Sequence, residues 1–165
     1  MYAKNSKKVK VETLLLPSYL AFAEGSVGGQ MFRKFYAKVN GKKLEVLRDG
    51  NYSCAIHITS ILKIFSLIKD VQLTVHRAMD AMERAGWYEI KKPKVGAIVV
   101  WAAKPAAADR GREYDKAYTP TVRHMGFLIS KTKAVHNSDT EKAPVIDDLH
   151  YRPIEKFYWH ERLGK

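Results

Sequence analysis

The spacing of apolar residues changes near Gly86, and this change constrains the fold more than any other feature of the sequence. Before Gly86, apolar residues recur at helical spacing over residues 53–69 and 74–85, and the first of these stretches is apolar nearly all round. After Gly86 they come in short extended runs separated by turn signals. Helices followed by short strands are typical of the α+β class, so we expect N-terminal helices packed on a small antiparallel β-sheet or half-barrel. The expected strands are 95–101, 122–130, 133–137, 144–146 and 154–159.

The first thirty residues differ from the rest of the chain in composition. They begin with a basic arm and continue with an apolar segment, 13–23, which Pro17 interrupts. Together with Glu12, this proline makes a poor export signal, and no apolar run in the chain is long enough to span a membrane. We therefore expect residues 1–30 to be an arm with an apolar segment, and residues 31–165 to form a single domain.

Three local signals complete the expected layout. Apolar and aromatic residues recur at helical spacing over residues 31–38, opposite basic ones, which predicts a short amphipathic helix. Thr74 is a plausible N-cap of the second helix, and Gly86 is expected to end it. Residues 104–120 are too polar and too long for a simple connector, so we expect either a cover over a site or a disordered loop.

The chain has one cysteine, Cys54, which stands where the turn signal Arg48-Asp49-Gly50-Asn51 gives way to the first apolar helix. No disulfide can form within the chain. At a helix start, a thiol lies near unpaired backbone N–H groups and the positive end of the helix dipole, which lower its pKa and can also bind an oxyanion. Cys54 is therefore a candidate nucleophile, and the alternative is a small buried apolar residue.

Among six histidines, His124 is the strongest candidate for a base that works with this thiol. It opens its strand with Gly126 two positions on, which leaves room beside the ring. The next strand ends in His136 and Asn137, and either side chain could orient the ring of His124. A two-residue turn between the strands puts Asn137 opposite Gly126, on the face of His124, whereas a three-residue turn or a bulge puts His136 there.

The remaining histidines carry weaker signals. His57 lies one turn after the cysteine and is expected to be a core or surface residue of that helix, and the others are expected to be solvated. Metal ligation by His124, His136, Asp139 and His150 is a further alternative, but their spacing matches no zinc motif. We expect neither a metal nor a cofactor.

The chain is strongly basic, with 29 Lys and Arg against 17 Asp and Glu and a formal net charge of +12. This excess predicts an anionic partner, such as a cell-wall polymer, a membrane surface or a nucleic acid. The basic residues are spread along the chain and no nucleic-acid-binding motif is found. A nucleic-acid-binding domain is therefore an alternative and not the first expectation.

The order of these features resembles that of the NlpC-type cell-wall peptidases, which are papain-like cysteine hydrolases related to the CHAP amidohydrolases. The resemblance covers roughly residues 45–160. It rests on a cysteine at a helix start, a second helix, a glycine-containing strand that ends in an aromatic residue, and the stretches HMGFLIS and KAVHNSDTEKAPVI. The family's Asp-Cys-Ser-Gly signature is replaced here by Ser53-Cys54-Ala55-Ile56, and its upstream Tyr-x-Trp-Gly-Gly run is missing.

This resemblance implies a papain-like fold and the hydrolysis of amide bonds in peptidoglycan stem peptides. Cys54 matches the nucleophile, His124 the base and His136 the orienter, while Asn137 would give the Cys-His-Asn arrangement of papain-like enzymes. Peptidoglycan or another anionic wall polymer is the implied partner, and the cell envelope or the exterior of the cell is the implied location. The alternatives are a papain-like module that has lost activity and only binds wall fragments, and the nucleic-acid-binding domain.

Overall fold

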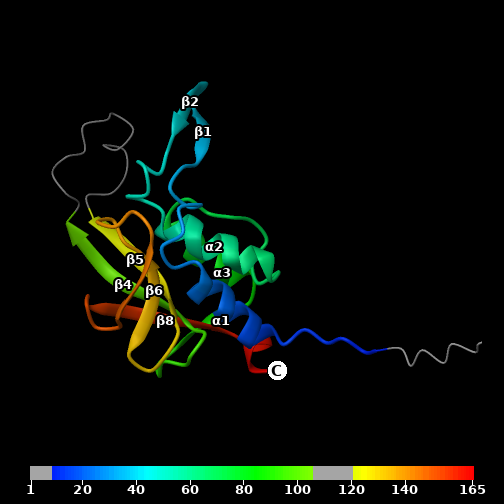
Figure 1. Ribbon diagram of the computed structural model, residues 1–165. Helices are drawn as coiled ribbons and strands as arrows, with labels where there is room; N and C mark the ends of the chain where they lie inside the picture. The colour runs from blue at the N-terminus through cyan, green and yellow to red at the C-terminus, as the bar shows by residue number, and fades with distance from the viewer. Residues whose placement is uncertain (1–8, 106–120) are drawn as a thin grey trace, which may run out of the picture.

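The computed structural model describes residues 9–105 and 121–165, and these form an α+β protein, as expected (Figure 1). The helices are α1 (Leu15–Gly25), α2 (Cys54–Ile64), α3 (Val75–Arg84) and the short 3₁₀ helix η1 (Glu161–Gly164). The strands are β1 (Tyr36–Val39), β2 (Lys42–Glu45), β3 (Trp87–Ile90), β4 (Ile98–Pro105), β5 (Thr121–Leu128), β6 (Lys133–Asn137), β7 (Pro144–Asp148) and β8 (Ile154–His160).

Strands β3 to β8 form one antiparallel sheet in the order β3-β8-β4-β5-β6-β7. Its central strand β4 is buried on both faces, as its continuous apolar run predicts, and Ile98, Val99, Val100 and Trp101 have no exposed surface. Ile98 and Val100 pack in the main core with the helices, whereas Val99 and Trp101 belong to a smaller cluster on the opposite face. The sheet therefore has a helix-covered face and a second face closed by the chain around Leu149.

Helix α1 belongs to the main core. Tyr19 and Ala23 are fully buried, and the Tyr19 hydroxyl donates a hydrogen bond to the Gly96 carbonyl oxygen at 3.1 Å. The Tyr19 ring also packs edge-on against Phe127 of β5, with the ring centroids 5.3 Å apart. These contacts attach α1 to the sheet, so the apolar face of this helix serves the packing of the core. Among the described residues, no helix is long and apolar enough to cross a membrane.

The prediction of a helix over residues 31–38 is wrong. Residues 36–39 instead form β1, which pairs with β2 around a turn at Asn40 and Gly41. Both turn residues have positive φ, 48° and 79°, a geometry that the Asn-Gly pair favours and that fits the twist of two antiparallel strands. The turn chemistry outweighs the helical spacing of the preceding aromatic residues.

Other element boundaries also differ from the expectation. Helix α2 ends at Ile64 and not at residue 69, because Ser66 adopts a left-handed conformation with φ of 55°. Strand β3, which was not expected, pairs with β8. Thr74 caps α3 as expected, since its side chain accepts a hydrogen bond from the Arg77 backbone N–H. Most of the expected loop 104–120 lies outside the described residues.

His57 is a residue of α2 and is completely buried. Its Nε2 is 2.8 Å from the Ser26 Oγ, and this hydroxyl donates to the Ala23 carbonyl oxygen. The Ser26 Oγ must therefore accept from His57, which places the ring proton on Nε2 and leaves Nδ1 buried without a hydrogen-bond partner. Burial, aided by the charge of His136, lowers the pKa of His57 from 6.5 to about 3.

This shift makes the stability of the fold sensitive to acid. Between pH 6.5 and about 3, the unfolded chain binds a proton at His57 that the folded chain does not bind. The free energy of unfolding should therefore fall as the pH falls through this window, by up to about 1.4 kcal/mol per pH unit. Urea unfolding at pH 4, 5, 6 and 7 measures this slope, and His57→Gln, which keeps a donor for Ser26, should flatten it. An equal slope in both proteins would contradict the assignment.

Candidate active site

Cys54 is the first residue of α2, and the turn before it is held by hydrogen bonds. The Glu45 carboxylate accepts hydrogen bonds from the backbone N–H groups of Phe35, Leu47 and Asp49. Gly50, with φ of 98°, packs so tightly on Lys142 that an added Cβ would lie 2.8 Å from the Lys142 carbonyl oxygen. These contacts fix the backbone that leads into the cysteine, so the position of the thiol is set by the fold.

The thiol of Cys54 is buried, with 8% of the residue exposed. Burial raises its pKa from 9.0 to about 11, although hydrogen bonds from the backbone of Ala55 and Met125 and the charge of Arg152 act in the opposite direction. The sequence-based expectation of a lowered pKa is therefore wrong for the thiol considered alone. At neutral pH this group is a thiol, and it becomes a thiolate only if a nearby base takes its proton.

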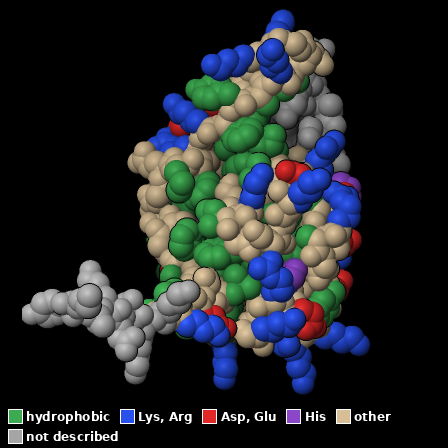
Figure 2. Space-filling view, turned by 90° about the vertical axis from the view of Figure 1, so that its right-hand side faces the viewer, with side chains coloured by type: hydrophobic (Ala, Val, Ile, Leu, Met, Phe, Trp, Pro, Cys, Tyr) green, Lys and Arg blue, Asp and Glu red, His purple; other side chains and the backbone are tan. Residues whose placement is uncertain are grey.

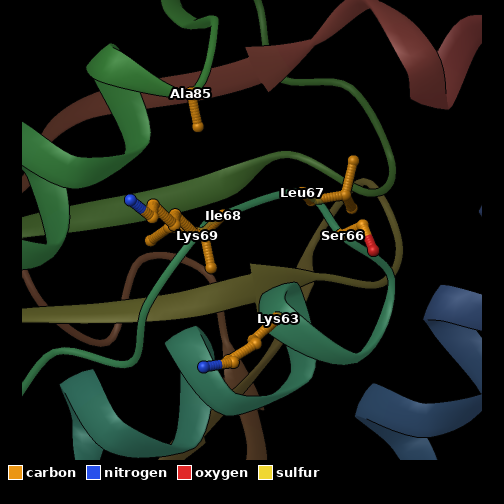
Figure 3. Close-up of a pocket in the computed structure, with 6 residues that line it drawn as sticks. All are labelled: Lys63, Ser66, Leu67, Ile68, Lys69 and Ala85. Carbon is orange, nitrogen blue, oxygen red and sulfur yellow. The ribbon is translucent and has the colours of Figure 1, made fainter.

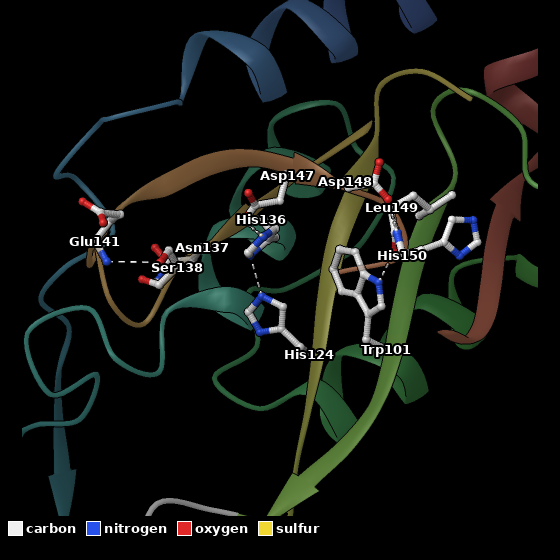
Figure 4. A network of polar contacts seen from close by, with 10 residues as sticks. All are labelled: Trp101, His124, His136, Asn137, Ser138, Glu141, Asp147, Asp148, Leu149 and His150. Carbon is white, nitrogen blue, oxygen red and sulfur yellow. Dashed lines mark hydrogen bonds and ion pairs between the residues drawn. The ribbon is translucent and has the colours of Figure 1, made fainter. Parts of the chain in front are cut away.

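Three neighbouring strands bring His124, His136 and Asp147 into one hydrogen-bonded chain (Figure 4). The His124 Nε2 is 2.9 Å from the His136 Nδ1, and the His136 Nε2 is 3.0 Å from the Asp147 Oδ2. The register explains the contact, because His136 pairs with Gly126, and residues opposite each other point to the same face. The turn between β5 and β6 has three residues, 130–132, because the Ile129 N–H donates to the Lys133 carbonyl oxygen across it.

The chain of contacts fixes the position of each ring proton. A carboxylate only accepts hydrogen bonds, so the His136 Nε2 carries a hydrogen that it donates to Asp147. Burial lowers the pKa of His136 despite the opposing hydrogen bond from Asp147, so its ring is neutral and its Nδ1 is an acceptor. The His124 Nε2 must then donate to His136. In neutral His124 this leaves Nδ1 as the basic nitrogen.

Aromatic rings surround the two histidines. Trp101 stacks on His124 at a centroid distance of 5.6 Å, and Tyr151 stacks on His136 at 4.6 Å with the planes 4° apart. The Trp101 Nε1–H donates to the Leu149 carbonyl oxygen at 2.9 Å, which fixes the indole (Figure 4). Such packing limits the rotation of both rings.

Asn137 has a different position from the one that an orienter needs. Its side chain points to the helix-covered face, where the Nδ2 donates to the Gly50 carbonyl oxygen at 2.8 Å. Successive residues of a strand point to opposite faces, so Asn137 and His136 cannot both face His124. Of the two residues that the sequence left open, the structure places His136 against His124 and Asn137 against the turn before the cysteine.

Cys54 packs in the main core on the helix-covered face of the sheet, whereas Trp101, which contacts both histidines, belongs to the cluster on the opposite face. The last β5–β6 pair is Gly126 with His136, and the next backbone group along β5, that of Met125, hydrogen-bonds the Cys54 sulfur. The thiol therefore lies where the ladder has ended, next to the residue that follows His124. Burial raises the pKa of Tyr151, the residue that stacks on His136, and a negative charge on Cys54 would raise it further.

Sequence reasoning missed Asp147, Trp101 and Tyr151. The signal for Asp147 was its place in the strand that follows His136, but the expected strand ended at residue 146. In addition, two adjacent aspartates are typical of a solvent-exposed segment. In the described part of the chain, no group of three or more His, Cys, Asp or Glu side chains could hold a metal ion.

Two cavities lie away from this site. One, of about 440 Å³, is at the C-terminal end of α2, whereas Cys54 is at the N-terminal end (Figure 3). Its lining includes Lys63, nine residues from Cys54, which corresponds to about 13 Å along the helix. The other, of about 330 Å³, lies between Arg33 and the outer strand β7. The polar chain of contacts, and not cavity size, therefore identifies the candidate site.

No protein-family model matches the chain, and a search of the curated proteins also finds no match.

The role assigned to Asp147 can be tested by replacing it with asparagine. Asp147 raises the pKa of His136 against the effect of burial, so Asp147→Asn should lower that pKa further. It should also reduce the fraction of His136 that carries its proton on Nε2. Nitrogen-15 NMR of the histidine rings during a pH titration measures both quantities. Asp148→Asn is the matched control, because Asp148 accepts its hydrogen bond from the backbone N–H of His150, outside the His124–His136–Asp147 chain. Identical His136 titrations in all three proteins would contradict the assignment.

Proposed function

We propose that the protein is a cysteine hydrolase with a papain-like fold, in which Cys54 is the nucleophile, His124 the base and His136 the orienter. The observation that carries this proposal is the hydrogen-bonded chain His124–His136–Asp147, which leaves the Nδ1 of His124 as a base next to the strand position that contacts the thiol. A nucleophile, a base and a group that orients the base are the parts that acyl transfer requires. The resemblance to the NlpC-type peptidases supports the same roles.

The raised pKa of the thiol fits this proposal if His124 and Cys54 act as a pair. Burial opposes an isolated thiolate, but it also strengthens the attraction between a thiolate and an adjacent imidazolium, because the local dielectric constant is low. The Nδ1 of His124, which does not take part in the hydrogen bond to His136, would receive the Cys54 proton. The imidazolium formed in this way is stabilised through His136 by the negative charge of Asp147.

The proposed reaction is amide hydrolysis in two steps. The Cys54 sulfur attacks the amide carbonyl carbon, and the backbone N–H groups at the start of α2 stabilise the oxyanion. The His124 Nδ1–H then gives its proton to the amine nitrogen, the C–N bond breaks and a thioester remains on Cys54. In the second step, His124 takes a proton from water, the resulting hydroxyl attacks the thioester, and the carboxylic acid leaves as Cys54 recovers its proton.

Peptidoglycan stem peptide is the proposed substrate, and the resemblance supports it together with the positive charge of the chain. The same resemblance supports a location in the cell envelope or outside the cell. A second candidate is a papain-like module that binds wall fragments without cleaving them. The observation that favours this candidate is the thiol itself, which is buried and has a raised pKa.

The pH dependence of Cys54 alkylation separates these two candidates. Because Cys54 is the only cysteine, the rate of iodoacetamide incorporation reports on this thiol alone. In a hydrolase, His124 should let the thiol react well below pH 8. In His124→Ala the thiol keeps its pKa of about 11, so alkylation should begin only in strongly alkaline solution. His150→Ala, which replaces an exposed histidine, should react like the parent. Parallel profiles for the parent and His124→Ala would favour the inactive module.

Cleavage itself is tested on purified peptidoglycan. The parent should release new amino groups from the stem peptides, and Cys54→Ala should lower the rate by about 10³-fold or more, because the covalent step is lost. Asn137→Ala should also reduce the rate, through the turn at Gly50 and not through His124. The proposal is wrong if Cys54→Ala releases amino groups as fast as the parent does.

A further inference from the structure

The β1–β2 hairpin projects from the body of the protein and forms a sheet of its own (Figure 1). The register places Tyr36 opposite Glu45 and Lys38 opposite Lys43, so these four residues share one face. Tyr36, Lys38 and Lys43 are exposed, and 57% of Tyr36 is accessible. The hairpin therefore offers solvent a face with one aromatic ring and two cations, which we call the basic hairpin face.

Within the hairpin, no acidic side chain pairs with the two lysines. Like charges directly opposite each other destabilise a pair of strands. Glu45 is the single acidic residue between positions 36 and 45, and its carboxylate is already engaged by the backbone N–H groups of residues 35, 47 and 49. An anion bound between Lys38 and Lys43 would remove this repulsion.

The aromatic ring adds a second kind of contact. The Lys43 Nζ lies 4.8 Å from the centroid of the Tyr36 ring, so a cation and an exposed aromatic face are adjacent. An anionic polymer that also has apolar or sugar surfaces would contact both. Figure 2 shows Lys and Arg side chains at the top of the molecule, where Figure 1 places the hairpin.

The hairpin is also coupled to the candidate site. The Val46 N–H donates to the Phe35 carbonyl oxygen at 2.9 Å and closes the base of the hairpin. The Glu45 carboxylate then reaches the Asp49 N–H at 3.0 Å, in the turn that precedes Cys54. A polymer held on the hairpin would therefore be held at a fixed position relative to the nucleophile.

We propose that the basic hairpin face, formed by Tyr36, Lys38 and Lys43, is a docking surface for the carboxylate-bearing glycan-peptide strand of the cell wall. This inference rests on the proposed hydrolase function, which supplies the identity of the polymer. The lysines pair with carboxylates of the strand, and the Tyr36 ring packs on its sugar or aliphatic surface.

Sedimentation with purified peptidoglycan sacculi tests the docking surface. The measurement is made in a Cys54→Ala background, so that cleavage does not change the ligand. Lys38→Gln combined with Lys43→Gln should weaken binding about tenfold, because two adjacent cation contacts are lost. The double substitution removes a repulsive pair, so the hairpin should still fold. Tyr36→Ala should weaken binding as well, without a change of charge. The matched control is Lys91→Gln combined with Lys92→Gln, which removes the same charge from an exposed turn after β3.

Each outcome decides between specific possibilities. Loss of binding in the hairpin variants alone supports the docking surface. Equal losses in the Lys91/Lys92 control would overturn it in favour of net charge. Competition by single-stranded DNA at a lower concentration than by soluble wall fragments would overturn it in favour of nucleic acid. Normal binding by the hairpin variants, together with cleavage by the parent, would overturn the docking surface and leave the hydrolase intact. Hairpin-dependent binding without cleavage by the parent would overturn the hydrolase.

Discussion

The pairing register of β5 and β6 brings the two histidines of the candidate site into contact. His136 faces His124 because it pairs with Gly126, and Asp147 reaches His136 because β7 continues the same register. A shift of one residue would turn His136 to the helix-covered face and break both hydrogen bonds. The close packing at Gly126 opposes such a shift, since an added Cβ there would lie 2.8 Å from both the Trp101 ring and the Val135 carbonyl oxygen.

Two opposing effects act on Cys54, and their balance determines its chemistry. The helix start and the N–H groups of Ala55 and Met125 favour the thiolate, but burial outweighs them and raises the pKa from 9.0 to about 11. This difference corresponds to about 3 kcal/mol against the isolated thiolate. In the proposed mechanism this energy comes from proton transfer to His124, whose ring is oriented through His136.

The sequence was sufficient for the fold class and for the strand that contains His124, because apolar spacing and turn residues are local signals. It was not sufficient for the choice between His136 and Asn137, since that choice depends on whether the turn has two or three residues. The lowered pKa expected for Cys54 was wrong because burial depends on residues distant in sequence. The helix expected over residues 31–38 failed for the opposite reason, since the Asn-Gly turn signal is local and was given too little weight.

The last two residues of β6, His136 and Asn137, contact two different parts of the candidate site. His136 points to one face and contacts His124, and Asn137 points to the other and holds the Gly50 carbonyl oxygen in the turn before Cys54. Because neighbouring residues of a strand necessarily face opposite sides, one short strand can position two groups that approach the sheet from different directions. His136 and Asn137, which the sequence offered as alternatives, therefore have complementary positions, His136 beside the ring of His124 and Asn137 beside the turn that leads into Cys54.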